Sequence, residues 1–159
     1  MGGLDLFGCL WLFFVYSFFG WIAETCFCVL KYRKFMNRGM LNSPLCIVYG
    51  ISAVIITIGF PELFDEIPIL FLGCAGVSTL LEWFTAKILE KLDHKKWWDY
   101  SSKRWNLDGY ICLQYSIVWG ILGVLSVKFV TPVLMKLYHM VPSFMMQIAL
   151  WALLGVLIV

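Results

Sequence analysis

Charged side chains are scarce in this sequence: aspartate, glutamate, lysine and arginine together make up 14% of its 159 residues, whereas 62% are hydrophobic. About a quarter of the residues in a soluble domain are charged. The shortage excludes an ordinary soluble domain, and the composition indicates an integral membrane protein. The net charge of +2 is small and comes from basic residues that flank apolar segments. The sequence therefore gives no reason to expect binding to nucleic acid.

Motifs for several kinds of chemistry are also missing. The six cysteines form no CxxC pair, and no histidine lies close enough to them to complete a metal site. We therefore predict no metal, no haem and no other cofactor. No nucleophile is paired with a base, so we assign no catalytic residue and favour a protein that is not an enzyme. No GxxxxGK[ST] phosphate-binding loop occurs, so an ATPase would have to be a separate chain.

Long apolar runs are the dominant feature that is present. A helix needs about 20 apolar residues to cross a hydrocarbon core of about 30 Å. Five runs approach that length, at residues 6–30, 40–60, 67–86, 110–130 and 141–159. Ser43-Pro44 is a typical helix start, which places the beginning of the second helix as late as Pro44. We predict an all-α fold: a polytopic membrane helix bundle with five transmembrane helices in one domain over residues 1–159.

The basic residues predict the orientation of the chain, because lysine and arginine collect in cytoplasmic loops beside membrane spans. Ten of the twelve fall between the first and second runs or between the third and fourth. The connection between the second and third runs contains Glu62, Asp65 and Glu66 and no basic residue. We therefore predict a multi-pass cell-membrane protein with its N-terminus outside and its C-terminus in the cytoplasm. Its two cytoplasmic loops would be 31–39 and 87–109.

Two carboxylates lie inside the apolar runs, Glu24 in the first and Glu82 in the third. A charged side chain within a span costs roughly 3 kcal/mol or more unless it is paired or hydrated, and such residues usually mark a functional site. Helical rise places Glu24 roughly 10 Å below the inner interface, where an Arg38 side chain can reach it. We predict a polar pocket formed by Glu24, Glu82, Arg38 and Asn42. The alternative is that Glu24 and Arg38 only lock two helices together.

The segment 93–108 alternates charged residues with tryptophan and tyrosine. These aromatic residues favour the headgroup region of a membrane, and lysine favours anionic lipid. Anchoring to anionic headgroups at the cytoplasmic face explains most of the segment. It does not explain Asp99, because a carboxylate gains nothing from an anionic surface. The alternative is a loop that folds over the polar pocket.

An approximate internal repeat relates residues 36–50 to residues 106–120. Tyr49 meets Trp119, and four residues of the first stretch meet identical residues: Gly39, Ile47, Val48 and Gly50. In both halves an acidic span leads into a basic loop and then into a helix with two glycines on one face. Transport folds are often built from duplicated units. We therefore predict either a parallel two-helix repeat or a chance match between glycine- and valine-rich sequences.

Several short motifs occur in an order that resembles one protein family. They are residues 16–24 (YSFFGWIAE), 37–44 (NRGMLNSP) and 98–101 (WDYS), together with Tyr49-Gly50, Asn106 and Trp119-Gly120. Over roughly residues 10–130 the chain resembles the family called Putative ABC-transporter type IV, which consists of small multi-pass membrane proteins, mostly bacterial. The resemblance implies a bacterial plasma-membrane protein, related by family name to ABC-transporter permeases. It also implies that Asn37, Tyr49 and Asn106 are characteristic positions.

Three classes of function remain open. We favour a transporter or transporter component that binds a small or lipid-like solute near the inner leaflet. The second class is a non-catalytic membrane scaffold or regulator that docks a partner protein, and the third is a lipid-modifying membrane enzyme. Five spans are few for a translocation path, so transport would favour a homodimer or a partner membrane protein or ATPase. The candidate solute-binding residues are Glu24, Asn37, Arg38, Asn42, Tyr49, Glu82, Asp99 and Asn106.

Overall fold

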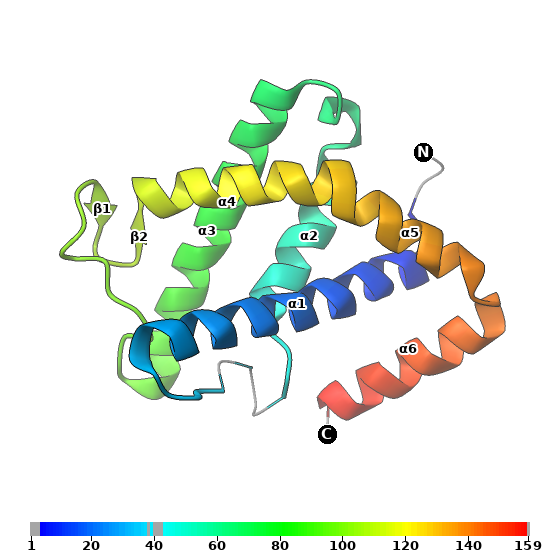
Figure 1. Cartoon of the computed structure of the whole chain (residues 1–159), viewed down its shortest axis with the longest axis horizontal. Helices are drawn as coiled ribbons and strands as arrows, with labels where there is room; N and C mark the ends of the chain where they lie inside the picture. Colours follow the sequence, from blue (N-terminus) through cyan, green and yellow to red (C-terminus); the bar gives the residue numbers. More distant parts are fainter. Residues whose placement is uncertain (1–3, 38, 40–42, 159) are drawn as a thin grey trace. The chain divides into compact units, whose positions relative to one another are not determined.

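The computed structural model describes residues 4–37, 39 and 43–158, which are mostly helical (Figure 1). The helices are α1 (Leu6–Tyr32), α2 (Ile47–Gly59), α3 (Ile67–Asp93), α4 (Leu113–Leu125), α5 (Thr131–Met140) and α6 (Ser143–Ile158). A short 3-10 helix, Pro61–Leu63, lies between α2 and α3. A small hairpin of β1 (Asn106–Leu107) and β2 (Ile111–Cys112) lies between α3 and α4. The predicted all-α class is confirmed.

One continuous helix joins α4 to α5 through five residues of π-helix, Ser126–Val130. Pro132 lies in the first turn of α5 and has no N–H with which to bond the preceding turn. A wider π-turn lets the helix continue past such a residue. The helix therefore continues past the apolar run 110–130, because the proline does not end it, and a membrane span over that run stays a prediction.

Three helical segments of the described chain are long and apolar enough to cross a membrane: Leu6–Tyr32, Ile67–Asp93 and Leu113–Met140. The apolar helices Ile47–Gly59 and Ser143–Gly155 are shorter. The 13 residues of α2 rise roughly 20 Å, which is less than a hydrocarbon core of about 30 Å. Three candidate spans are thus established, and five transmembrane helices stay a prediction.

Two predicted helix boundaries need correction. α3 continues to Asp93, so residues 87–93 of the predicted loop 87–109 are helical. Lysine is a good helix former, and Lys91 in the last turn favours the negative end of the helix dipole. α2 begins at Ile47 and not at Pro44, and the Cys46 N–H just before it donates to the Ser17 carbonyl oxygen of α1 (2.8 Å).

The chain divides into two compact units, which are described separately. Unit 1 comprises Met1–Val54 and Phe129–Val159, and unit 2 comprises Ile55–Lys128. The boundaries fall inside α2 and inside the π-helical segment. One transmembrane domain over residues 1–159 stays a prediction.

Helix α1 is the centre of unit 1 and packs against α5 and α6. One core cluster contains Leu12, Tyr16 and Leu134, and another contains Phe14, Met146 and Leu150. The hydroxyl groups of Tyr16 and Thr131 share a hydrogen bond of 2.8 Å in this interior. Such bonds between spans satisfy polar groups that lipid cannot.

Helices α3 and α4 pack closely in unit 2 because α4 presents glycines to α3. A Cβ on Gly120 would lie 2.5 Å from Phe71, and one on Gly123 would lie 2.5 Å from Cys74. The Thr79 hydroxyl donates to Ser116 Oγ across the same interface (2.8 Å). Small residues and hydroxyl bonds between helices are typical of membrane bundles.

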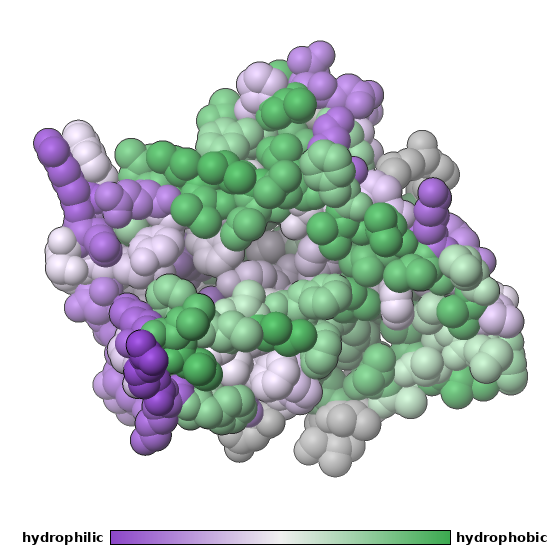
Figure 2. Space-filling model, in the orientation of Figure 1, coloured by the Kyte–Doolittle hydropathy of each residue, from purple (hydrophilic) through white to green (hydrophobic). Residues whose placement is uncertain are grey.

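The outer surface of unit 2 is apolar along α4 and charged at one end of that helix. Six residues of α4 each expose 44–52% of their surface: Leu113, Ile117, Val118, Ile121, Leu122 and Leu125. Figure 2 shows this apolar surface in green. Past the end of α4, Lys128 Nζ lies 3.4 Å from Asp65 Oδ1, and the Asp65 side chain is fully exposed. An apolar outer surface is what a lipid-facing helix requires.

Candidate functional site

The carboxylate of Glu24 is held between α1 and α2 in unit 1. The Tyr49 hydroxyl donates to Glu24 Oε1 (2.8 Å). Gly20 lies one turn before Glu24 and leaves room for the tyrosine, because a Cβ there would lie 2.7 Å from Tyr49 Cβ. Glu24 itself is half-buried. Of the predicted site residues in this unit, the structure brings Glu24 and Tyr49 into direct contact.

Asn37 holds the segment that follows α1. Its Oδ1 accepts hydrogen bonds from Trp21 Nε1 (2.7 Å) and from the Gly39 N–H (2.9 Å). These bonds tie the segment to α1. Arg38 and Asn42 lie outside the residues that the structure describes, so their contacts stay predictions.

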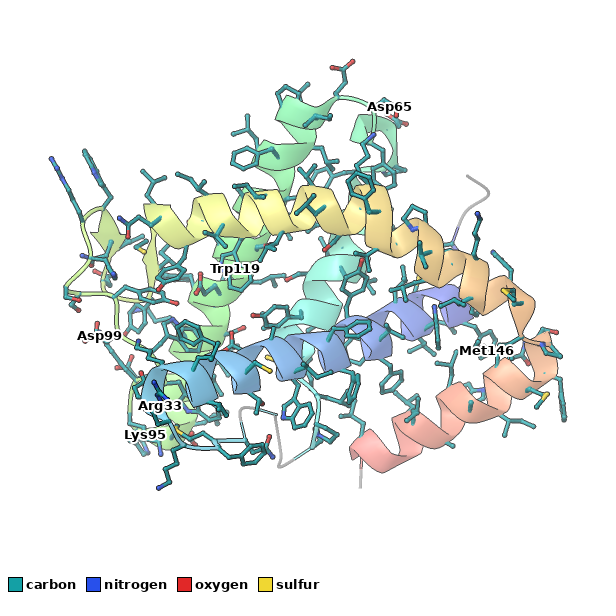
Figure 3. All side chains as sticks on the ribbon, viewed as in Figure 1. Arg33, Asp65, Lys95, Asp99, Trp119 and Met146 are labelled. Atoms are coloured by element: carbon teal, nitrogen blue, oxygen red, sulfur yellow. The ribbon has the colours of Figure 1, made fainter. Side chains whose placement is uncertain are left out.

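Glu82 is the buried carboxylate of unit 2, with 9% of its surface exposed. Nε1 of Trp119 on α4 (Figure 3) donates to its Oε2 (3.0 Å), and the Tyr100 hydroxyl donates to its Oε1 (3.2 Å). The Tyr100 ring stacks on Tyr115 of α4, with the ring centroids 4.6 Å apart. Two neutral donors, one on each oxygen, fix the orientation of the carboxylate. A pocket shared with Glu24 stays a prediction, because the two carboxylates belong to different units.

Sequence reasoning did not place Tyr100, Tyr115 or Trp119 in the site. Trp119 carried a signal, since it meets Tyr49 in the internal repeat. The sequence signal for Tyr100 was weaker. Tyr100 belongs to the motif at residues 98–101 that resembles the family, but its contact with Glu82 of α3 depends on how the segment 94–112 folds.

Hydrogen bonds of the Asp99 and Asn106 side chains stabilise the turns of the segment 94–112. Asp99 Oδ1 accepts from the Ser101 N–H (2.9 Å) and hydroxyl (2.5 Å). Asn106 Nδ2 donates to the carbonyl oxygens of Ser101 (3.3 Å) and Lys103 (2.7 Å), and its Oδ1 accepts from the Gly109 N–H (3.1 Å). Gly109 has a φ of 75°, which glycine adopts without strain. These bonds account for the carboxylate that anchoring leaves unexplained; contact of Asp99 and Asn106 with a solute stays a prediction.

Tyr110 joins this segment to α3, and 6% of its surface is exposed. Lys87 Nζ and Lys96 Nζ lie 4.2 Å and 4.6 Å from the centroid of its ring. Its hydroxyl donates to Glu90, and that hydrogen bond raises the pKa of Tyr110 above its ordinary value. Trp98 Nε1 donates to the Tyr110 carbonyl oxygen (2.9 Å). The segment therefore folds back on α3, and contact with anionic headgroups stays a prediction.

Asp99 makes the stability of this segment depend on pH. Hydrogen bonds from the Ser101 hydroxyl and N–H, with the Lys96 charge nearby, lower the pKa of Asp99 below its ordinary 3.8. Because the folded state has the lower pKa, the charged side chain stabilises the segment above about pH 4, and this stability is lost as the pH falls through the folded pKa. We expect hydrogen-exchange protection of the Ser101 and Gly109 amides, corrected for intrinsic rates, to fall between about pH 5 and about pH 3.

Asp99→Ala is the control for this pH effect. It removes the titrating group and the acceptor of both Ser101 bonds. Protection in the variant should be lower than in the wild type near neutral pH and nearly independent of pH over the same range. An identical pH response in the two proteins would contradict the role assigned to Asp99.

Long apolar helices that carry carboxylates within their length define a membrane protein. The sequence model of the family described as Putative ABC-transporter type IV matches residues 11–159. This chain belongs to that family, and the resemblance inferred from the short motifs is confirmed. No curated protein and no solved structure matches the chain.

Proposed function

We propose that this protein is the membrane-embedded component of a transporter and binds a small or lipid-like solute near the inner leaflet of the cell membrane. The observation that carries the proposal is Glu82, a buried carboxylate in an apolar helix that Trp119 and Tyr100 hold in one orientation. Carboxylates inside membrane spans commonly mark substrate or ion pathways. Fixing such a group before binding lowers the entropic cost of recognition. The family to which the chain belongs supports the transport class.

The side chains beside the carboxylates define the chemistry of the solute. Glu24 and Glu82 supply acceptor oxygens and negative charge, which favour a ligand with N–H or O–H donors or a positive group. Tyr49, Tyr100 and Trp119 place aromatic rings beside those oxygens, and such rings favour an apolar portion. The proposed solute is therefore amphipathic. Arg38, Asn42, Asn37, Asp99 and Asn106 complete the proposed binding set.

The basic segments place this site at the cytoplasmic side in our proposal. Lys95, Lys103 and Arg104 are exposed on the segment 94–112, where anionic headgroups would attract them. The N-terminus then lies outside and the C-terminus inside. ATP hydrolysis comes from a separate chain, and a homodimer or a partner membrane protein completes the translocation path.

Native mass spectrometry of the detergent-purified protein tests the proposal. Glu82→Gln removes the charge from the site, and Glu62→Gln is the matched control because Glu62 is exposed in the same unit. We expect the wild type and the control to retain the same bound species. Glu82→Gln should retain roughly tenfold less of it, since a hydrogen bond to a charged group contributes about 1.5–3 kcal/mol.

Two outcomes would contradict solute binding: a wild-type protein that carries no bound species, or a Glu82→Gln protein that retains it undiminished. Either result would favour a membrane scaffold that docks a partner protein. The masses in the same spectra also report whether the protein is a monomer or a homodimer.

A further inference from the structure

The two units contain the same arrangement of a carboxylate and an aromatic donor. In unit 1 the Tyr49 hydroxyl donates to Glu24 (2.8 Å), and in unit 2 the Trp119 indole donates to Glu82 (3.0 Å). Each carboxylate lies on a 27-residue helix, α1 or α3, and each donor lies on the next apolar helix, α2 or α4. The sequence repeat sets Tyr49 against Trp119 without reference to these contacts.

A second contact recurs in the same register. The residue after each aromatic donor is a glycine, Gly50 or Gly120. A Cβ on Gly50 would lie 2.8 Å from the Phe13 ring, and one on Gly120 would lie 2.5 Å from the Phe71 ring. Each phenylalanine precedes the carboxylate of its own unit by 11 residues, about three turns of helix, so it lies on the same helix face as that carboxylate.

The connecting segments make a similar contact, but at positions one residue apart in the repeat, where Asn106 meets Met36 and not Asn37. The Gly39 N–H donates to Asn37 Oδ1 (2.9 Å), and the Gly109 N–H donates to Asn106 Oδ1 (3.1 Å). Phe13 and Glu24 match Phe71 and Glu82, which lie 58 residues later in the chain. Residues 36–50 match residues 106–120, which lie 70 residues later. The connection in unit 2 is therefore 12 residues longer, and this longer connection carries Tyr100.

We infer that residues 13–50 and 71–120 are two copies of one structural unit, and that Tyr49 and Trp119 are its equivalent positioning residues. Each orients the carboxylate of its own copy toward the solute, a step that rests on the function proposed above. Agreement among the hydrogen bond, the glycine contact and the sequence register carries the inference. Each copy offers a carboxylate beside an aromatic ring to a solute that combines N–H or O–H donors with an apolar group.

Substitution of the two donors tests the inference. Tyr49→Phe and Trp119→Phe remove the donor and keep a ring, whereas Trp119→Tyr puts the residue of the first copy into the second. Trp105→Phe is the matched control, because that tryptophan is 70% exposed. Retained ligand is measured by native mass spectrometry, and the unfolding midpoint is measured on the same preparations. We expect roughly tenfold less ligand in both donor-removing variants, no loss in the control and substantial recovery in Trp119→Tyr.

The outcomes separate the parts of the inference. A loss in only one of the two phenylalanine variants, or a Trp119→Tyr protein no better than Trp119→Phe, would overturn the equivalence of the two copies. Lower midpoints with undiminished ligand would overturn the positioning role. If the wild type carries no ligand, the proposed function fails. Recovery of the midpoint by Trp119→Tyr then supports the equivalence on its own, and absence of recovery overturns it.

Discussion

Gly50→Ala is expected to lower the free energy of unfolding by about 1–3 kcal/mol, the usual cost of an extra carbon in a packed contact. The new Cβ would fall on Ser17 Oγ and on the Phe13 carbonyl oxygen. Because that oxygen belongs to the backbone of α1, it cannot rotate away, and the two helices must separate. Separation also draws Tyr49 away from Glu24. The measurement is the unfolding midpoint, followed by circular dichroism as SDS is added to mixed micelles.

Gly76→Ala is the matched control. A Cβ at Gly76 meets no described atom within 4 Å, and the residue lies within α3. Alanine is better than glycine in a helix by about 1 kcal/mol. The control should therefore leave the midpoint unchanged or raise it. If both variants lose stability equally, the close contact between α1 and α2 is not the cause.

Glu82→Ala is expected to lower the free energy of unfolding by about 3 kcal/mol or more. The substitution leaves the Trp119 N–H and the Tyr100 hydroxyl without the carboxylate that accepts from both. A hydrogen bond to a charged group contributes about 1.5–3 kcal/mol, and a buried donor that loses its acceptor carries a further penalty. Glu82→Gln keeps one acceptor oxygen, so its free energy of unfolding should fall less than that of Glu82→Ala. SDS titration of the variants gives the comparison.

A double-mutant cycle assigns this loss to a particular pair. The cycle combines Glu82→Ala with Trp119→Phe, and residues in direct contact usually couple by 0.5–3 kcal/mol, whereas distant residues add. We expect the loss of unfolding free energy in the double variant to be about 1 kcal/mol smaller than the sum of the losses in the two single variants. Simple additivity would mean that the indole–carboxylate bond contributes little to folding.

The starts of α1 and α3 could be predicted from the apolar runs, whereas the start of α2 and several helix ends could not. α1 begins at Leu6 and α3 at Ile67, as the apolar runs predict. α3 passes its predicted end because lysine and glutamate extend a helix beyond the apolar stretch without breaking it. The join between α4 and α5 was missed because a proline usually signals a helix boundary, and the π-turn that accommodates Pro132 leaves no periodic pattern in the sequence.

For the site, the carboxylates could be predicted and most of their partners could not. The cost of a charge inside an apolar run singles out Glu24 and Glu82 from composition alone. Which side chain donates to them depends on contacts between helices, and Tyr100 reaches Glu82 only because the segment 94–112 folds back on α3. The turn made by Asp99 could have been read from the sequence, since aspartate two residues before serine is typical of such turns.

The ion pair between Lys128 and Asp65 predicts where the membrane surface lies beside unit 2. Because a fully exposed aspartate is costly in hydrocarbon, we expect the lipid-covered part of this helix to run from Leu113 to no further than Lys128. These residues rise roughly 24 Å, less than the roughly 30 Å of an average hydrocarbon core. We therefore expect a bilayer with acyl chains shorter than average to match this stretch better than an average bilayer does.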